Sequence, residues 1–116
     1  MAWGQYLGLD LYDCDKSKIR NTEDMKYFVI ALCKEIDMQR YKKTLIERFG
    51  EGMIEGYSAF QFIKTSSITI HFEEQKNQVM MDLFSCKEFN MQKVVDFTLD
   101  WYGGKIQKIM PSTRGK

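Results

Sequence analysis

Two segments with helical periodicity, separated by a series of strand-like runs, constrain the fold of this chain most. In the first segment Asn21 or Thr22 can act as the N-cap, and Asp24 lies early in the first turn, where its charge favours the helix dipole. The second segment begins after Asn90 and is stopped by Gly103-Gly104. The positions that share one helical face are Met25, Phe28, Val29, Leu32, Cys33 and Ile36 in the first segment and Met91, Val94, Val95, Thr98 and Trp101 in the second. Each stripe predicts an amphipathic helix that buries one face against a core.

The segments around these helices have the patterns of strands and turns. Residues 6–12 alternate between two faces, and β-rich runs separated by short polar stretches follow the first helix. The expected strands are residues 6–12, 42–49, 57–64, 67–72, 79–85 and 105–110, and residues 111–116 are expected to form a frayed polar tail. This order predicts an α+β fold, a two-layer sandwich with two helices packed on one face of a mainly antiparallel sheet. The other face must then be solvated or covered by a second subunit.

The length and charge of the chain exclude several classes of function. Its 116 residues fit a single domain, residues 1–116, with no visible linker. The chain has 17 Lys and Arg residues against 16 Asp and Glu residues, a formal net charge of +1. It therefore lacks the excess of positive charge that favours binding to nucleic acid or an anionic membrane. The longest apolar run, Phe28 to Cys33, is too short to span a bilayer. We therefore expect no nucleic-acid partner and no membrane partner.

The cysteine and histidine content predicts a reduced protein without a metal site. The three cysteines, Cys14, Cys33 and Cys86, have no close pair spacing, and the chain contains one histidine. The first residues have neither the basic region nor the apolar region of a signal peptide. A cytoplasmic location is the simplest expectation.

One segment is rich in residues that can perform chemistry. Ser58, Ser66 and His71 lie within fourteen residues, and Cys86 follows fifteen residues later, at the end of the next expected strand. Taken singly, each has a structural explanation, because hydroxyls commonly fill a solvated strand face and a cysteine can act as a small hydrophobe. No spacing in the chain matches a metal motif, a phosphate loop or a nucleophile elbow. The residues alone leave a structural and a catalytic interpretation open.

Four short motifs, taken in order, are more specific. The chain has Leu-Asp-Leu-Tyr-Asp-Cys-Asp at 9–15, Gly-Tyr-Ser at 56–58, Thr-Ser-Ser-Ile-Thr-Ile-His at 65–71 and Asp-Leu-Phe-Ser-Cys at 82–86. The corresponding motifs of the bacterial-type S-adenosylmethionine decarboxylases are Leu-Asp-Leu-Tyr-Gly-Cys-Asp, Gly-X-Ser, Glu-Ser-His-Ile-Ser-Ile-His and Asp-Val-Phe-Thr-Cys. The spacing from the serine to the cysteine is also kept. The chain therefore resembles this family over nearly its whole length.

The resemblance implies that the chain cuts itself between Thr65 and Ser66. The Ser66 hydroxyl would attack the preceding carbonyl and convert the peptide bond to an ester, and elimination would leave residues 1–65 as the β chain and residues 66–116 as the α chain with an N-terminal pyruvoyl group. By position, Ser58 would stabilise the oxyoxazolidine intermediate and His71 would remove the α proton of the serine. Because a regular strand places Ser66 and His71 on opposite faces, their contact requires an irregular backbone at residues 64–67.

The implied activity is pyruvoyl-dependent decarboxylation of S-adenosylmethionine, which supplies aminopropyl groups for spermidine synthesis. The ketone of the self-derived pyruvoyl cofactor would condense with the substrate amine as a Schiff base, and the Cys86 thiol would return a proton after carbon dioxide leaves. Family members of this length form dimers with active sites near the interface, so the resemblance also implies a homodimer. Trp3, Tyr6 and Phe49 are the candidates for stacking on the adenine.

The residues around the motifs depart from the family pattern in two places. Thr65 and Ser67 replace the family's Glu and His on either side of the serine, and the reaction uses the carbonyl of residue 65 rather than its side chain. After His71 the family has Thr-Trp-Pro-Glu, whose Glu holds the ribose hydroxyls. Here the aligned residue is Gln75, and Glu74 stands one position earlier, so Glu74 and Gln75 are the candidate substrate-binding residues.

These departures leave other functions open. One is a pyruvoyl-dependent decarboxylase of a basic amino acid, ornithine or arginine, with the same self-cleavage. Another is an uncleaved, non-catalytic homologue that binds or regulates a partner subunit. The last is a generic α+β binding domain in which the motif matches are accidental.

Overall fold

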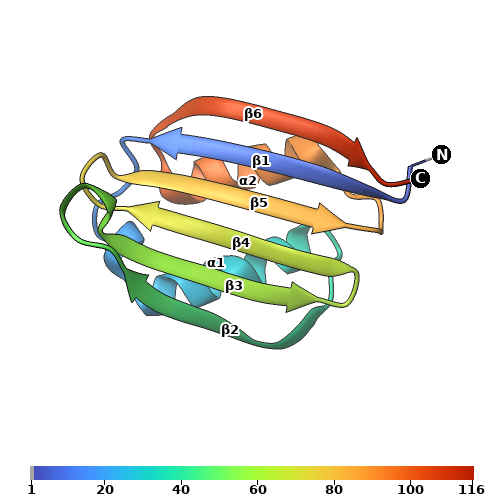
Figure 1. The fold of residues 1–116 in the computed structure, drawn as a ribbon, viewed down its shortest axis with the longest axis horizontal. Coiled ribbons are helices and arrows are strands. Elements are labelled where there is room, and N and C mark those ends of the chain that lie inside the picture. The colour runs from blue at the N-terminus through green and yellow to red at the C-terminus, as the bar shows by residue number, and fades with distance from the viewer. Residues whose placement is uncertain (1) are drawn as a thin grey trace.

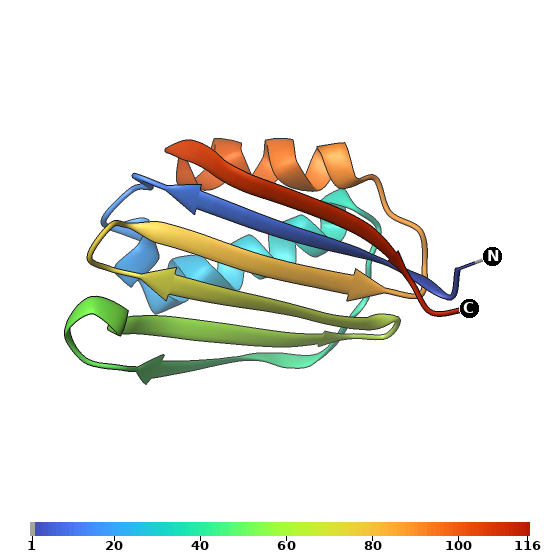
Figure 2. The ribbon, with the colours of Figure 1, turned by 45° about the horizontal axis from the view of Figure 1, so that its top comes forward.

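The computed structural model describes residues 2–116 and forms one six-stranded antiparallel sheet covered on one face by two helices (Figure 1, Figure 2). The strands follow each other across the sheet in the order β2-β3-β4-β5-β1-β6. Their bounds are β1 (Gly4–Tyr12), β2 (Arg40–Phe49), β3 (Gly56–Ile63), β4 (Ser66–Glu73), β5 (Gln78–Ser85) and β6 (Lys105–Arg114); the helices are α1 (Thr22–Glu35) and α2 (Met91–Tyr102), with short 3-10 turns η1 (Lys18–Arg20) and η2 (Gly52–Ile54). The predicted α+β two-layer architecture is confirmed.

Polar caps start both helices. The Asn21 side chain accepts a hydrogen bond from the backbone N–H of Asp24 at 3.0 Å, so Asn21 is the cap of α1 and Thr22 is its first residue. The Asn90 side chain accepts from the N–H of Lys93 at 3.0 Å in the same way. Both helices therefore begin at the polar residues that the sequence indicated.

The hydrophobic core lies between the sheet and the helices. Leu7, Leu9 and Leu11 of β1 are completely buried, in agreement with their alternation in the sequence. Phe28 of α1 and Tyr102 of α2 are also fully buried, and their ring centroids lie 4.9 Å apart. No element of the described residues 2–116 covers the opposite face of the sheet (Figure 2).

The last strand is longer than the sequence indicated. The expected frayed tail from Pro111 is wrong, because β6 continues to Arg114 and stays paired with β1, so that the two ends of the chain lie side by side (Figure 1). Proline cannot donate a hydrogen bond to a sheet, which argues against a central strand. β6 is an edge strand, however, and the missing N–H of Pro111 costs nothing on its open side.

The turn between β3 and β4 sets the register of the central strands. Only Lys64 and Thr65 separate the two strands, so Ile63 pairs with Ser66 and, five pairs further, Ser58 pairs with His71. β5 lies on the other side of β4 and places Ser85 opposite Ser66. The cysteine that follows Ser85 is thereby brought to the turn that contains the expected cleavage bond.

The outer face of the sheet, opposite the helices, carries polar and apolar side chains together. Alternation along β3 and β4 turns Ala59 and Ile70 toward the core and Ser58, Phe62 and His71 outward. Large apolar side chains at the β2–β3 edge remain half exposed there, at 50% each for Tyr41, Leu45 and Phe62. Within residues 2–116, no helix is long and apolar enough to cross a membrane.

Candidate active site

Ser58 and His71 form a hydrogen-bonded pair on the outer face of the sheet. The Ser58 Oγ lies 2.9 Å from His71 Nδ1, because the two residues are direct neighbours across β3 and β4. Gly56, the first residue of the Gly-Tyr-Ser motif, allows the strands to approach. A Cβ atom there would lie only 1.7 Å from the carbonyl oxygen of Phe72. The sequence indicated both residues, and the structure brings them together.

A pocket of about 410 Å³ opens beside this pair. Its walls come from the end of β2, from η2 and from the neighbouring ends of β3, β4 and β5. The lining residues are Phe49, Ile54, Gly56, Tyr57, Ser58, His71, Phe72, Glu73 and Met80. The pocket is therefore largely apolar, with two hydroxyls, one imidazole and one carboxylate, and is suited to an organic ligand with a few polar groups.

The expected cleavage bond lies at the opposite end of β4, where its carbonyl is polarised. The backbone N–H of Cys86 donates a hydrogen bond to the carbonyl oxygen of Thr65 at 3.0 Å. A fixed N–H donor at this oxygen stabilises the negative charge that develops when a nucleophile attacks the carbonyl carbon. The arrangement is that of a one-donor oxyanion site, built by the end of β5.

Side chains also hold Thr65 in place. The buried Ser85 hydroxyl donates to Thr65 Oγ1 at 2.8 Å, and Thr65 Oγ1 in turn points to Met38 Sδ at 3.5 Å. The backbone N–H of Lys87 donates to Ser85 Oγ at 3.0 Å. These contacts fasten the β3–β4 turn to the end of β5, so the carbonyl of Thr65 and the N–H of Cys86 keep their relative position.

Ser66 itself has a strained backbone. Its φ angle is +155°, a region that residues with a side chain seldom occupy. Such a conformation costs on the order of 1–3 kcal/mol and persists only where the surroundings impose it. Because φ depends on the carbonyl carbon of Thr65, cutting the bond between Thr65 and Ser66 removes this constraint. Strain thus favours breakage of the bond that the sequence singled out.

Within one chain His71 does not reach Ser66. The expected irregularity is confined to the two-residue turn and the φ angle of Ser66, and β4 from Ser66 to Glu73 pairs in regular register with β3 and β5. Five residues of strand at about 3.3 Å each separate Ser66 from His71 by about 16 Å. The chain therefore holds two half-sites, the Ser58–His71 pair and the Thr65–Ser66–Cys86 corner, at opposite ends of β4.

Cys86 is the accessible thiol in the described part of the chain. Cys14 and Cys33 are buried, and burial raises the pKa of each to about 11, which keeps both thiols protonated and unreactive. Cys86 is exposed immediately after β5, next to the corner that contains Ser66. Its position is compatible with proton donation at the N-terminus that cleavage would create.

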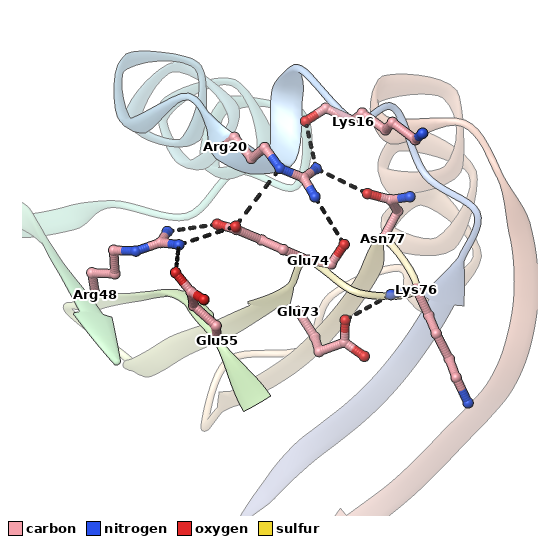
Figure 3. A network of polar contacts seen from close by, with 8 residues as sticks. All are labelled: Lys16, Arg20, Arg48, Glu55, Glu73, Glu74, Lys76 and Asn77. Carbon is pink, nitrogen blue, oxygen red and sulfur yellow. Dashed lines mark hydrogen bonds and ion pairs between the residues drawn. The ribbon is translucent and has the colours of Figure 1, made fainter. Parts of the chain in front are cut away.

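The candidate substrate-binding residues, Glu74 and Gln75, lie in different environments. Glu74 does not line the pocket, and its side chain is bound by Arg48, whose two terminal nitrogens lie 2.6 and 3.0 Å from its oxygens (Figure 3). This hydrogen bonding lowers the pKa of Glu74 below its ordinary value. Gln75 is exposed in the β4–β5 turn and lines a different surface hollow. Glu73, which the sequence comparison passed over, lies in the pocket beside His71.

The three aromatic residues that are candidates for stacking on adenine also lie in different places. Phe49 lines the pocket, whereas Trp3 packs against Phe84 at 5.7 Å between ring centroids. Tyr6 donates a hydrogen bond to Asp82, and that bond raises the pKa of Tyr6 to about 12. Sequence reasoning could not choose among them because the choice depends on which strand ends meet at the pocket.

The described residues, 2–116, contain no group of three or more His, Cys, Asp or Glu side chains arranged to hold a metal ion.

The chain is similar to known proteins in sequence and in fold. A family model described as S-adenosylmethionine decarboxylase matches residues 5–115. Two similar proteins from Clostridium botulinum, from strains Langeland and Loch Maree, are both named S-adenosylmethionine decarboxylase proenzyme; they are 27% and 28% identical over 114 residues, covering 97% of this chain and 95% of each relative. The fold is similar to the crystal structure of the adenosylmethionine decarboxylase from Aquifex aeolicus, with a TM-score of 0.80 and 18% identity over 99% of this chain and 92% of the other.

Proposed function

Because this chain belongs to the S-adenosylmethionine decarboxylase family, we propose that it is a pyruvoyl-dependent decarboxylase of S-adenosylmethionine that forms by self-cleavage between Thr65 and Ser66. The observation that carries the proposal is the hydrogen bond from the Cys86 N–H to the Thr65 carbonyl oxygen. It supplies a stabilising donor at the one carbonyl whose attack by a neighbouring serine would cut the chain.

The residues at this corner fit the formation of a pyruvoyl group. Ser66 directly follows the polarised carbonyl and has a strained φ of +155°. Attack of its Oγ on the Thr65 carbonyl carbon forms an ester as the C–N bond breaks. Loss of the Ser66 α proton then expels the Thr65 carboxylate, and hydrolysis of the remaining enamine releases ammonia. The products are residues 1–65 and residues 66–116, the latter beginning with the pyruvoyl group.

Once formed, that group supplies a ketone that condenses with an amine and withdraws electrons as carbon dioxide leaves. The chain's own residues have separate tasks around it. Cys86 holds a proton on Sγ for delivery to the substrate carbon. Phe49 lies at the other end of β4, so its apolar wall offers a stacking surface to adenine bound at the pyruvoyl group of the partner subunit. We assign the ribose contact to Glu73 because it lines the pocket. Its carboxylate oxygens each accept one hydrogen bond, from the Lys76 N–H and from Gln78 Nε2, and each keeps a lone pair for a hydroxyl, whereas the carboxylate of Glu74 is held by two nitrogens of Arg48.

A second copy of the chain completes the site. The Ser58–His71 pair lies about 16 Å from Ser66 within one chain, too far for the imidazole to take its α proton. A two-fold axis between two facing sheets, running across β4, would bring Ser66 of one protomer opposite the partner subunit's Ser58 and the partner subunit's His71. The half-exposed Tyr41, Leu45 and Phe62 on this face favour such burial. We assign this homodimer to the cytoplasm.

Carbon dioxide release tests the substrate. The purified cleaved protein is incubated with S-adenosylmethionine, ornithine or arginine, each labelled in the carboxyl group. The proposal requires release from S-adenosylmethionine with a kcat/KM at least tenfold above that for either amino acid. Preferential release from ornithine or arginine would retain the pyruvoyl chemistry but overturn the proposed substrate. No release from any of the three would overturn the proposed decarboxylase activity.

A further inference from the structure

A network of charged side chains lies directly behind the pocket. The Arg48 guanidinium, at the end of β2, binds both carboxylate oxygens of Glu74 and also pairs with Glu55 (Figure 3). Arg20 reaches Glu74 from the opposite side, with Nε 3.7 Å from Oε1, and donates to the Glu74 carbonyl oxygen at 2.8 Å. A planar guanidinium with several donors is suited to holding two carboxylates at once.

Each residue bound by Arg48, and Arg48 itself, is next in sequence to a residue that lines the pocket. Arg48 precedes Phe49, Glu55 follows Ile54, and Glu74 follows Glu73. The Arg48 guanidinium also stacks over the ring of Tyr57, another lining residue, at 4.9 Å from the ring centroid. Movement of Arg48 therefore shifts three segments of the pocket wall together.

The segment between β2 and β3 has few other contacts that could fix it. Ile54 is 76% exposed, so packing alone does not immobilise it. Phe49, the last residue of β2, is paired with Gly56, but its side chain is 59% exposed. The backbone bonds of Ile54 and Glu55 are local, from their N–H groups to the carbonyls of Glu51 and Gly52 at 3.4 and 3.3 Å. The links from this segment to the β4–β5 turn are the Arg48 ion pairs and one hydrogen bond from the Glu74 N–H to the Glu55 carbonyl at 3.1 Å.

We infer that Arg48 is a positioning residue that fixes the Phe49–Ile54 wall of the pocket and so determines substrate affinity without contacting the reacting atoms. This inference rests on the proposed function, because it requires the pocket beside Ser58 and His71 to bind S-adenosylmethionine. It also gives the Glu74 carboxylate a role, as the partner of Arg48, although Glu74 does not line the pocket. The Arg48 guanidinium contacts Glu74, Glu55 and the ring of Tyr57 rather than Ser58 or His71, so we expect self-cleavage not to depend on it.

Steady-state kinetics separates positioning from general stability. In Arg48→Met and Glu74→Gln we expect the KM for S-adenosylmethionine to rise about tenfold, with kcat and the extent of self-cleavage within twofold of wild type. Arg48→Lys, which keeps the charge but cannot hold both carboxylates, is expected to give an intermediate KM. The matched control is Lys26→Met, which removes another exposed ion pair, to Glu23 on α1, and should leave all three quantities unchanged.

Hydrogen exchange provides a readout that needs no substrate. Amides of residues 50–55 should exchange at least fivefold faster in Arg48→Met than in wild type, while amides of β4 and β5 stay unchanged. Equal exchange in the two proteins, or an unchanged KM, would overturn the inference. If wild type decarboxylates no S-adenosylmethionine but the loop amides respond as described, the proposed substrate fails and the positioning role of Arg48 stands.

Discussion

The backbone N–H of Cys86 donates a hydrogen bond to the carbonyl oxygen of Thr65 at 3.0 Å, and the thiol of the same residue is exposed next to the Thr65–Ser66 peptide bond. In the proposed function this one residue therefore serves two stages by two different groups, its backbone in chain cleavage and its side chain in turnover. Because every residue except proline has a backbone N–H, substitutions at this position can separate the two stages.

Cys86→Ala should therefore cleave itself normally and turn over poorly. The N–H donor to Thr65 is retained, whereas the proton donor for the substrate carbon is lost. We expect cleavage within twofold of wild type and kcat lowered about 100-fold, the usual scale for a general acid. Denaturing electrophoresis measures the extent of self-cleavage, and carbon dioxide release measures kcat. Product analysis reports protonation at the wrong carbon. A kcat equal to that of wild type would contradict the role of the thiol.

Ser85→Ala should slow self-cleavage. The Ser85 hydroxyl is buried and holds Thr65 Oγ1 at 2.8 Å, so its removal loosens the turn that aligns the scissile carbonyl. The loss of one such hydrogen bond is about 1 kcal/mol, which corresponds to cleavage slowed about fivefold. The rate is followed by mass spectrometry after refolding of the precursor. Ser112→Ala, on the exposed part of β6, is the control, and equal rates in the two variants would contradict the assignment.

Complementation between subunits tests the composite site. Ser66→Ala and His71→Ala should each remain uncleaved when expressed alone. When they are expressed together with tags of different mass, the heterodimer pairs an intact Ser66 with the partner subunit's His71, and the His71→Ala chain should be cut. If the mixture stays uncleaved although heterodimers form, the imidazole must act within its own chain and the proposed arrangement is wrong.

Acid should selectively remove the contribution of Glu74 to stability. Pairing with Arg48 lowers the pKa of Glu74 below its ordinary value of about 4.3, so the stabilisation is complete above pH 4.3 and is lost as pH falls through the lowered pKa. Wild type should melt a few degrees above Glu74→Gln at pH 6, and this difference should shrink toward zero by about pH 2. Thermal unfolding followed by circular dichroism measures both proteins; a difference independent of pH would contradict the coupling.

Local signals in the sequence were sufficient for most of the fold. The N-cap residues Asn21 and Asn90 start the helices where their hydrogen-bonding side chains indicated. The end of β6 was misjudged, because the cost of Pro111 depends on whether its strand lies at an edge, and strand order is a property of the whole chain.

The candidate site was predictable only in part. Motif order pointed to Ser58, Ser66, His71 and Cys86, but spacing did not show that Ser58 pairs with His71. The sequence pattern predicts an irregular backbone over residues 64–67. A two-residue hairpin turn at Lys64 and Thr65 is what sets the observed pairing of Ser58 with His71. The pocket and the Arg48 network join residues far apart in sequence. Periodicity carries no information about which strand ends meet.

The intact mass of the purified wild-type protein tests the central claim most directly. Self-cleavage between Thr65 and Ser66 predicts two polypeptides, residues 1–65 with an unmodified carboxyl terminus and residues 66–116 lighter by one ammonia than the unmodified sequence, because the serine has become a pyruvoyl group. Ser66→Ala should give one chain with the mass of the whole sequence. A wild-type protein that also stays a single chain of full mass would contradict the account.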